Sequence, residues 1–172
     1  MSAGRADGGA PLPDIERAAF ERTAHLALDH RAMAVVSNVF RLSTAIRRRM
    51  ERTVLAADDL SWTAFVVLWV LWIWGEMESR DLAAAVGISK PTSSGVVTTL
   101  ERRGLVHRRR GADDGRMVRV SLTPDGRTMI EGLFPRFNAE EAKVTAALPP
   151  SDQEAVAAAL RALLQAVEDD RA

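Results

Sequence analysis

The chain has no cysteine in its 172 residues. Disulfide bonds, thiolate metal sites and redox sensing through a cysteine are therefore excluded. Its 23 basic and 23 acidic residues give a formal net charge of zero. Attraction to a polyanion would thus have to come from a local patch and not from the molecule as a whole.

Long apolar runs are also missing. The most apolar segment, FVVLWVLWIW at 65–74, has only ten residues, which is too short for a helix that spans a bilayer. We expect a buried helix here, with Ser61 as its N-cap. Since no targeting signal is evident either, we expect a cytoplasmic protein with no membrane partner.

Motifs typical of enzymes are absent as well. The sequence has no phosphate-cradling glycine-rich loop and no nucleophile elbow. Its acidic pairs at 58–59 and 113–114 look like a helix cap and a turn. We therefore expect neither an enzyme nor a bound cofactor.

The segment from 79 to 102 predicts two short helices joined by a tight turn. Ser79 is placed to cap the first helix, and Gly87 follows it where a C-cap glycine is expected. Ser89 is placed to cap the second helix, with Pro91 in its first turn. The second helix would bury its apolar side chains and expose a face that is unusually small and hydroxylic, a composition suited to close approach to base edges and phosphates. The buried residues would be Val96, Val97 and Leu100, and the outward ones Lys90, Thr92, Ser94, Gly95, Thr98 and Thr99.

A basic hairpin is predicted next. Residues 105–110 and 117–122 read as two extended runs, joined by the turn-forming residues 111–116. Between Ser89 and Arg119 the chain has eight cations and three anions, a local charge of +5, whereas the segment after the hairpin is acidic. Helix, turn, helix and basic hairpin together predict a winged helix-turn-helix that contacts nucleic acid.

The motifs in this segment resemble those of the MarR family, the multiple-antibiotic-resistance regulators. They are DLAAAVGISKPTSSGVVTTLERRGLVHRRR, the wing tip at 114–116 and the phrase VSLTPDG at 120–126. The resemblance implies a wing-tip arginine, here Arg116, that enters the DNA minor groove, and an aspartate, here Asp114, that orients it. The chain departs from the family pattern at Gly95 and Gly115, where longer polar or basic residues are common.

We accordingly expect a sequence-specific DNA-binding regulator, by analogy a ligand-responsive repressor. Its second helix would enter the major groove and its wing would contact the minor groove. The expected DNA-binding residues are Ser89, Lys90, Pro91, Thr92, Ser94, Gly95, Thr98, Thr99, Arg102, Arg108, Arg110, Asp114 and Arg116.

The predicted fold is mainly α with a small β-hairpin wing. We expect a disordered tail at 1–13, N-terminal helices at 14–56, the DNA-binding lobe at 57–123 and C-terminal helices at 124–172. The helical patterns at 14–30 and 31–55 suit either two helices or one. Because the outer helices have apolar faces with no second domain to cover them, we expect a homodimer on a palindromic operator with half-sites roughly 10 bp apart. The alternative is a monomer that folds its termini over its own core.

Aromatic residues line one face of the apolar helix at spacings of three and four: Trp62, Phe65, Trp69 and Trp72. Such a stripe is typical of a protein core, but it can also line a pocket for a small lipophilic or phenolic ligand, which the family resemblance implies. Both interpretations stay open, and both can hold at once.

Two further alternatives remain. His25, Asp29 and His30 lie close together, and the first two would share a helix face at i, i+4 and could bind a metal; without cysteine support we expect no metal site. We expect His107, in the wing, to lie near a DNA phosphate and not to bind a metal. Finally, the glycines at 95 and 115 leave open a small-molecule-binding or scaffold dimer that keeps the winged fold without specific DNA recognition.

Overall fold

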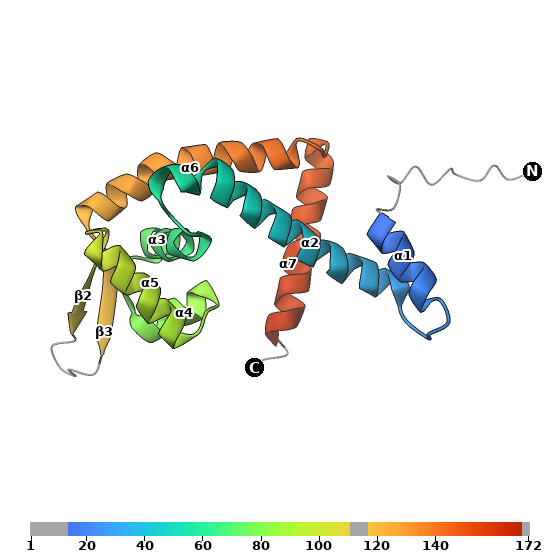
Figure 1. Cartoon of the computed structure of the whole chain (residues 1–172), viewed down its shortest axis with the longest axis horizontal. Helices are drawn as coiled ribbons and strands as arrows, with labels where there is room; N and C mark the ends of the chain where they lie inside the picture. Colours follow the sequence, from blue (N-terminus) through green and yellow to red (C-terminus); the bar gives the residue numbers. More distant parts are fainter. Residues whose placement is uncertain (1–13, 111–116, 170–172) are drawn as a thin grey trace, which may run out of the picture. The chain divides into compact units, whose positions relative to one another are not determined.

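The computed structural model of the chain describes residues 14–110 and 117–169. Its helices and strands follow one another as shown in Figure 1. They are α1 (Asp14–Thr23), α2 (His30–Thr53), the 3-10 helix η1 (Leu55–Asp58), α3 (Trp62–Trp74), β1 (Met77–Glu78), α4 (Ser79–Val86), α5 (Lys90–Arg102), β2 (Val106–Arg110), β3 (Val118–Leu122), α6 (Pro124–Thr145) and α7 (Pro150–Asp169). The predicted mainly helical fold with a hairpin wing is confirmed. The tail at 1–13 lies outside the described residues.

The chain divides into two units, Met1–Ala45 and Ile46–Ala172. In the first unit, α1 and α2 are separate helices. Asp29 ends the connection between them, because its Oδ1 accepts hydrogen bonds from the backbone N–H groups of Arg31 and Ala32 at 3.0 Å each and so caps α2. The opening helix therefore ends at Thr23 instead of near His30. Asn38 donates to the buried Glu16 carboxylate at 2.9 Å and ties α2 to α1.

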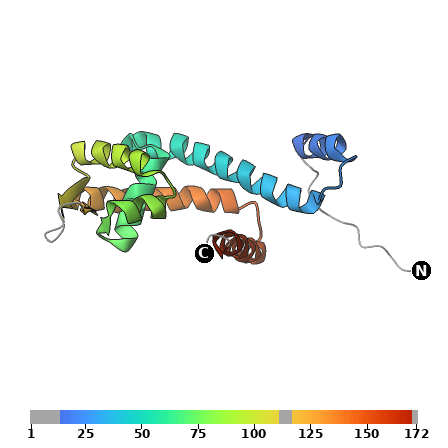
Figure 2. The same ribbon diagram turned by 90° about the horizontal axis from the view of Figure 1, so that it is seen from below.

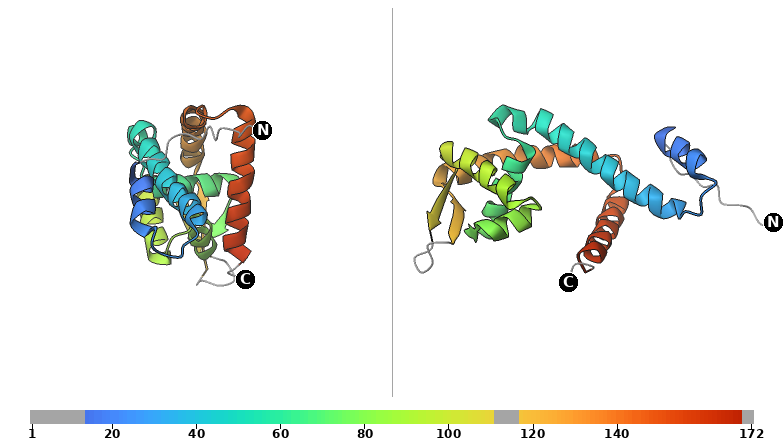
Figure 3. Two further views of the ribbon diagram at one scale, coloured as in Figure 1. Left: turned by 90° about the vertical axis from the view of Figure 1, so that its right-hand side faces the viewer. Right: turned by 60° about the horizontal axis from the view of Figure 1, so that its bottom comes forward.

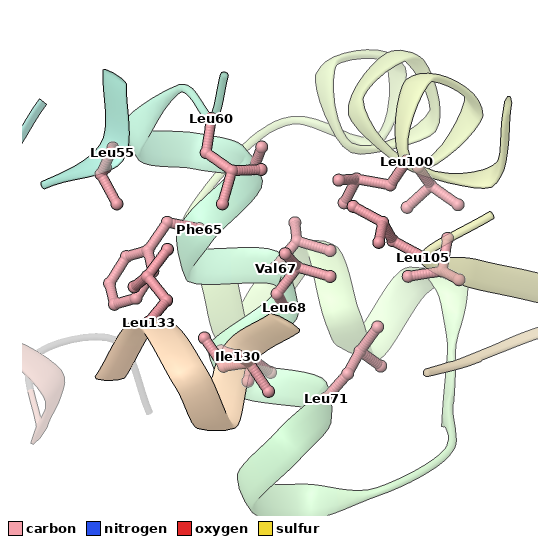
Figure 4. Close-up of a cluster of buried hydrophobic side chains, with 14 of the residues drawn as sticks. Leu55, Leu60, Phe65, Val67, Leu68, Leu71, Leu100, Leu105, Ile130 and Leu133 are labelled. Atoms are coloured by element: carbon pink, nitrogen blue, oxygen red, sulfur yellow. The ribbon is translucent and has the colours of Figure 1, made fainter. Parts of the chain in front are cut away.

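The second unit is organised around α3, which has α4 and α5 on one side and α6 on the other (Figures 1 and 2). As predicted, the Ser61 hydroxyl caps this helix, accepting from the Ala64 N–H at 3.2 Å. Gly75, at a φ of 77°, ends it. The apolar side chains of α3 meet those of the neighbouring elements in one core, drawn in Figure 4. The core residues labelled there are Leu55, Leu60, Phe65, Val67, Leu68, Leu71, Leu100, Leu105, Ile130 and Leu133.

The predicted helix-turn-helix is present, with one correction at its start. Gly87 adopts the left-handed conformation at a φ of 72° and ends α4, and the Ser89 hydroxyl caps α5 by accepting from the Thr92 N–H at 3.3 Å. The prediction that Ser79 caps α4 is wrong. Ser79 is the first helical residue, and its hydroxyl donates to the Val118 carbonyl at 3.0 Å, which ties α4 to the wing.

The wing has three strands instead of the predicted two. β3 lies in the middle and pairs antiparallel with β2 on one side and with the two-residue β1 on the other. In the longer pair, Arg108 lies opposite Val120 and Arg109 opposite Arg119. β1 was not predicted, because a strand of two residues is too short to show an alternation of apolar and polar side chains.

The start of α6 is fixed to the turn before the wing. Thr123 caps the helix, with its Oγ1 accepting from the Gly126 N–H at 3.0 Å and donating to the Gly104 carbonyl at 2.6 Å. The Thr123 N–H also donates to the Leu105 carbonyl at 3.1 Å. The glycine of the VSLTPDG phrase is required here: a Cβ on Gly126 would lie 1.9 Å from the Leu105 carbonyl oxygen.

Helix α6 continues through Pro135 and ends at Thr145. Ser151, although a residue type favoured at N-caps, lies inside the last helix. Helix α7 begins at Pro150, with the Pro149 carbonyl accepting from its first turn, and Gln153 instead caps α6 by donating to the Thr145 and Leu148 carbonyls at 3.2 and 3.0 Å. Over its described span, α7 contains no buried residue.

Helices long and apolar enough to cross a membrane are not found in the described part of the chain.

The close approach of Gly126 to Leu105 gives a stability prediction. G126A should lower the free energy of unfolding by about 3 kcal/mol, because the added methyl group meets backbone that can move only if α6 shifts. G132A is the matched control in the same helix: no atom lies within 4 Å of its Cβ, and alanine should raise stability by up to about 1 kcal/mol. Urea unfolding measures both, and equal effects of the two variants would contradict the prediction.

Candidate nucleic-acid interface

The outward face of α5 is the first part of the candidate interface. All the residues that the sequence placed outward are exposed, as are the flanking Ser89, Pro91 and Arg102. Val97 and Leu100 are buried as expected, while Val96 is half-buried. Ser93 is buried and was not anticipated, although it lies one turn before Val97 on the same helix face.

Several hydroxyl groups on this face are already hydrogen-bonded within the helix. The Thr98 hydroxyl donates to the Ser94 carbonyl at 2.7 Å, and the Thr99 hydroxyl donates to the Gly95 carbonyl at 3.2 Å. The hydroxyls of Ser89 and Thr92 lie 2.8 Å apart. Each of these groups therefore has less hydrogen-bonding capacity to offer a ligand than its residue type suggests.

The second part of the interface is the wing, which stands beside α5 (Figure 3). Arg108 of β2 faces the helix and pairs with Glu101. The Glu101 Oε2 accepts from Arg108 Nε at 2.9 Å and from Nη2 at 2.6 Å, and the same Nη2 donates to the Thr98 hydroxyl at 3.1 Å. Hydrogen bonding to the Arg108 guanidinium lowers the pKa of Glu101, which therefore stays ionised at neutral pH.

The outer face of the wing is held by a carboxylate that follows α3. Glu76 accepts from Arg109 at 2.9 and 3.2 Å and contacts Arg119 at 3.5 Å. Hydrogen bonding to Arg109 is the main cause of a lowered pKa at Glu76. Sequence reasoning missed this residue, because it lies outside the basic segment and is separated from its two partners by 33 and 43 residues.

The described cations of the segment thus fall into three groups. Arg103 donates to the backbone carbonyls of Asp59 and Asp58 at 2.6 and 2.7 Å. Arg108, Arg109 and Arg119 are paired with carboxylates. Within the described residues, Lys90, Arg102 and Arg110 have no ion-pair partner and are exposed. The predicted Asp114 and Arg116, with Gly115 between them, lie outside the described residues.

A hollow of about 490 Å³ separates the helix-turn-helix from the wing. Its walls come from α4, α5 and both long strands. The lining residues are Glu78, Ser79, Arg80, Lys90, Ser93, Ser94, Val97, Arg108, Met117 and Val118.

The aromatic stripe of α3 lines a separate pocket of about 530 Å³ between α3 and α6. Trp62, Phe65 and Trp69 belong to its wall, whereas Trp72 does not: its indole N–H donates to Glu131 at 3.3 Å and its ring packs on Phe134. Phe65 is also part of the core, so the stripe serves both interpretations that its spacing left open. The remaining lining residues are Arg47, Thr63, Val66, Val86, Ile88, Phe134, Phe137 and Glu141.

The predicted placement of His25 and Asp29 on one helix is wrong, since both lie in the connection between α1 and α2. Asp29 caps α2, and the His30 ring packs edge-on against Phe20 at 5.5 Å. In the described ranges, no three side chains of His, Cys, Asp or Glu gather closely enough to hold a metal ion. His107 lies within 3.1 Å of the Ser121 hydroxyl on the neighbouring strand.

Comparison with known proteins gives consistent matches. The profile of the MarR family matches residues 60–118. YwaE, an uncharacterized HTH-type transcriptional regulator of Bacillus subtilis strain 168, is 36% identical over 135 residues, which are 78% of this chain and 79% of YwaE.

Among solved structures, BpsR of Bordetella bronchiseptica, whose DNA binding is regulated by 6-hydroxynicotinic acid, is 28% identical with a TM-score of 0.67. The match covers 74% of this chain and 97% of BpsR. MepR of Staphylococcus aureus in complex with DNA is 24% identical and shares the fold, with a TM-score of 0.69 over 77% of this chain and 97% of MepR.

Proposed function

Because the chain belongs to the MarR family of DNA-binding transcriptional regulators, a family that is not enzymatic, we propose that it is a homodimeric, ligand-responsive repressor of a palindromic operator. The observation that carries this proposal is the exposed, small and hydroxylic face of α5 beside a basic wing. A face of that kind lets the helix backbone approach base edges closely.

In the proposed complex, the two α5 helices of a dimer enter successive major grooves. Lys90, Arg102 and Arg110 are exposed and without ion pairs in the described part of the chain, which suits them to phosphate contacts. Arg116 would reach the minor groove with Asp114 orienting its guanidinium, as the family resemblance implies. The described residues 57–110 and 117–123 would form the DNA-binding lobe.

Dimerisation is supported by apolar residues that the chain leaves uncovered. The described part of α7 exposes Val156, Leu160, Leu163, Leu164 and Val167, each between 41% and 58%. In the first unit, α2 exposes Val35, Val36, Val39, Phe40 and Leu42. In the dimer, these exposed apolar residues would be buried against a second copy of the chain, with segments 14–56 and 124–172 forming the interface.

The pocket beside α3 is the proposed ligand site. Its aromatic wall, with Arg47 and Glu141 as charged members, suits a small lipophilic or phenolic compound. BpsR offers a precedent in which a hydroxylated aromatic acid regulates DNA binding. Binding would shift the population of the dimer towards a spacing of the two α5 helices that no longer fits the operator.

DNA binding is tested by selecting genomic fragments with the purified protein and footprinting the best one. We expect protection of a short palindrome. K90Q should weaken binding similarly for all sequences and reduce the salt slope by roughly 1 per subunit, because one phosphate contact is lost. R161Q, which removes a charge from the exposed surface of α7, is the control and should bind as the wild type. Binding that is weak, salt-sensitive and blind to sequence would instead favour a small-molecule-binding or scaffold dimer.

Dimerisation is tested by charges placed on the apolar row of α7. The double variant L160D/L164D should sediment as a monomer at concentrations where the wild type is a dimer, because two carboxylates would have to be buried at the interface. Q165D introduces one such carboxylate on the opposite face of α7 and should remain dimeric, whereas L160D alone, with one carboxylate in the apolar row, should already weaken the dimer. A monomeric wild type would contradict the proposal.

The ligand site is tested by calorimetry with 6-hydroxynicotinic acid and related hydroxylated aromatic acids. For any compound that binds, W69A should weaken binding about tenfold through loss of one aromatic contact. W74A is the control, because Trp74 lies on the same helix but outside the pocket lining and is 71% exposed. Equal losses in both variants would argue against this pocket.

A further inference from the structure

The hydroxyl of Thr98 has a defined and incomplete set of hydrogen bonds. A threonine hydroxyl has one proton and can accept two hydrogen bonds. The Thr98 proton is given to the Ser94 carbonyl at 2.7 Å, and one acceptor position receives Arg108 Nη2 at 3.1 Å. One acceptor position remains, on an exposed side chain. In this arrangement Thr98 can therefore accept one more hydrogen bond and has no proton left to donate.

The arginine that contacts Thr98 is itself fixed in direction. Glu101, one helical turn further along α5, holds Arg108 Nε and Nη2 through Oε2, and its Oε1 accepts from the Arg108 backbone N–H at 3.2 Å. A planar guanidinium bound at two nitrogens keeps its orientation. The pair also neutralises Arg108, which makes it a poor phosphate ligand although its position in the sequence suggests one.

The major groove distinguishes the bases by donors and acceptors. Adenine and cytosine present an exocyclic amine, whereas guanine and thymine present only acceptors as polar groups on their edges. On a given strand, a residue that can only accept a hydrogen bond therefore matches adenine N6 or cytosine N4, and it leaves guanine O6 or thymine O4 without a partner.

We propose that Thr98 is a specificity-determining residue that accepts a hydrogen bond from the amine of adenine or cytosine, and that Glu101 and Arg108 are the positioning residues that fix its hydroxyl. This inference rests on the DNA-binding function proposed above. It changes the role of Arg108 from a phosphate contact to a brace between the wing and α5.

The test is selection from a duplex pool with a randomised centre, followed by sequencing at one fixed salt concentration, with the full-length protein. The wild type should prefer adenine or cytosine over guanine or thymine by about tenfold at one position on one strand of each half-site, the usual cost of a mismatched base pair. T98V, which removes the hydroxyl and keeps the shape, should reduce that preference to less than about twofold and leave other positions unchanged. T98S keeps the hydroxyl and should retain the preference.

The positioning pair gives a separate readout. E101Q should relax the preference at the same position as T98V, because the guanidinium is no longer held by a charged partner. R108M should also relax the base preference at this position, without reducing the salt dependence of DNA binding. K90Q should leave every base preference intact while lowering overall affinity. A merely structural role of Glu101 would change all positions together, so this pattern separates the two roles.

Matching melting temperatures of the variants establish that folding is unchanged. The inference would be overturned if the wild type selected guanine or thymine at the position that T98V affects. It would also be overturned if T98V kept the base preferences of the wild type. If R108M lowered the salt dependence of DNA binding, Arg108 would be a phosphate contact and not a positioning residue. Selection of no sequence by the wild type would overturn the proposed function itself, a result distinct from a specific operator that is read without Thr98.

Discussion

Burial of α3 is the constraint on which the rest of the second unit depends. The helix has apolar residues on every face, so it is stable only where other elements cover it. α4 and α5 cover one side and α6 the other (Figure 4). Because α4, α5 and α6 all pack on α3, this helix links the candidate interface to α6. Trp62 and Trp69 of the pocket wall lie on the same helix, so in the proposed function a bound ligand would contact the helix that supports α5.

The wing has less unpaired positive charge than its arginine content suggests. Glu76 and Glu101 each bind arginines of the strands, one from the end of α3 and one from α5. Both carboxylates have lowered pKa values because of these arginines, so both keep their charge at neutral pH. The two pairs fix the wing to the helices on either side of the sheet. Part of the local positive charge thus positions the wing, and in the proposed function the phosphate contacts come from the described cations that have no ion pair.

The sequence predicted most of the lobe because its signals are local. Helix starts are marked by the capping residues Ser61, Ser89 and Thr123, and a helix end is marked by Gly87. Each of these residues lies within one turn of the helix end that it caps. What it missed depends on contacts between distant residues. The hydroxyl of Ser79 bonds to Val118, and Glu76 bonds to Arg109, so neither role follows from its neighbours in the chain. The break before α2 was missed as well: Asp29 caps α2 and does not share a helix with His25.

Residue type alone also misjudges the recognition surface, and the reason is competition for hydrogen bonds. Within helix α5, a threonine can donate back to the carbonyl four residues earlier, as Thr98 and Thr99 both do. Such a group stays exposed, but its proton is already used. Arg108 is likewise a cation whose hydrogen bonds are directed to Glu101 and Thr98. In the proposed function, specificity on this face would therefore follow from the donors and acceptors that the fold leaves unused, which a count of polar residues does not give.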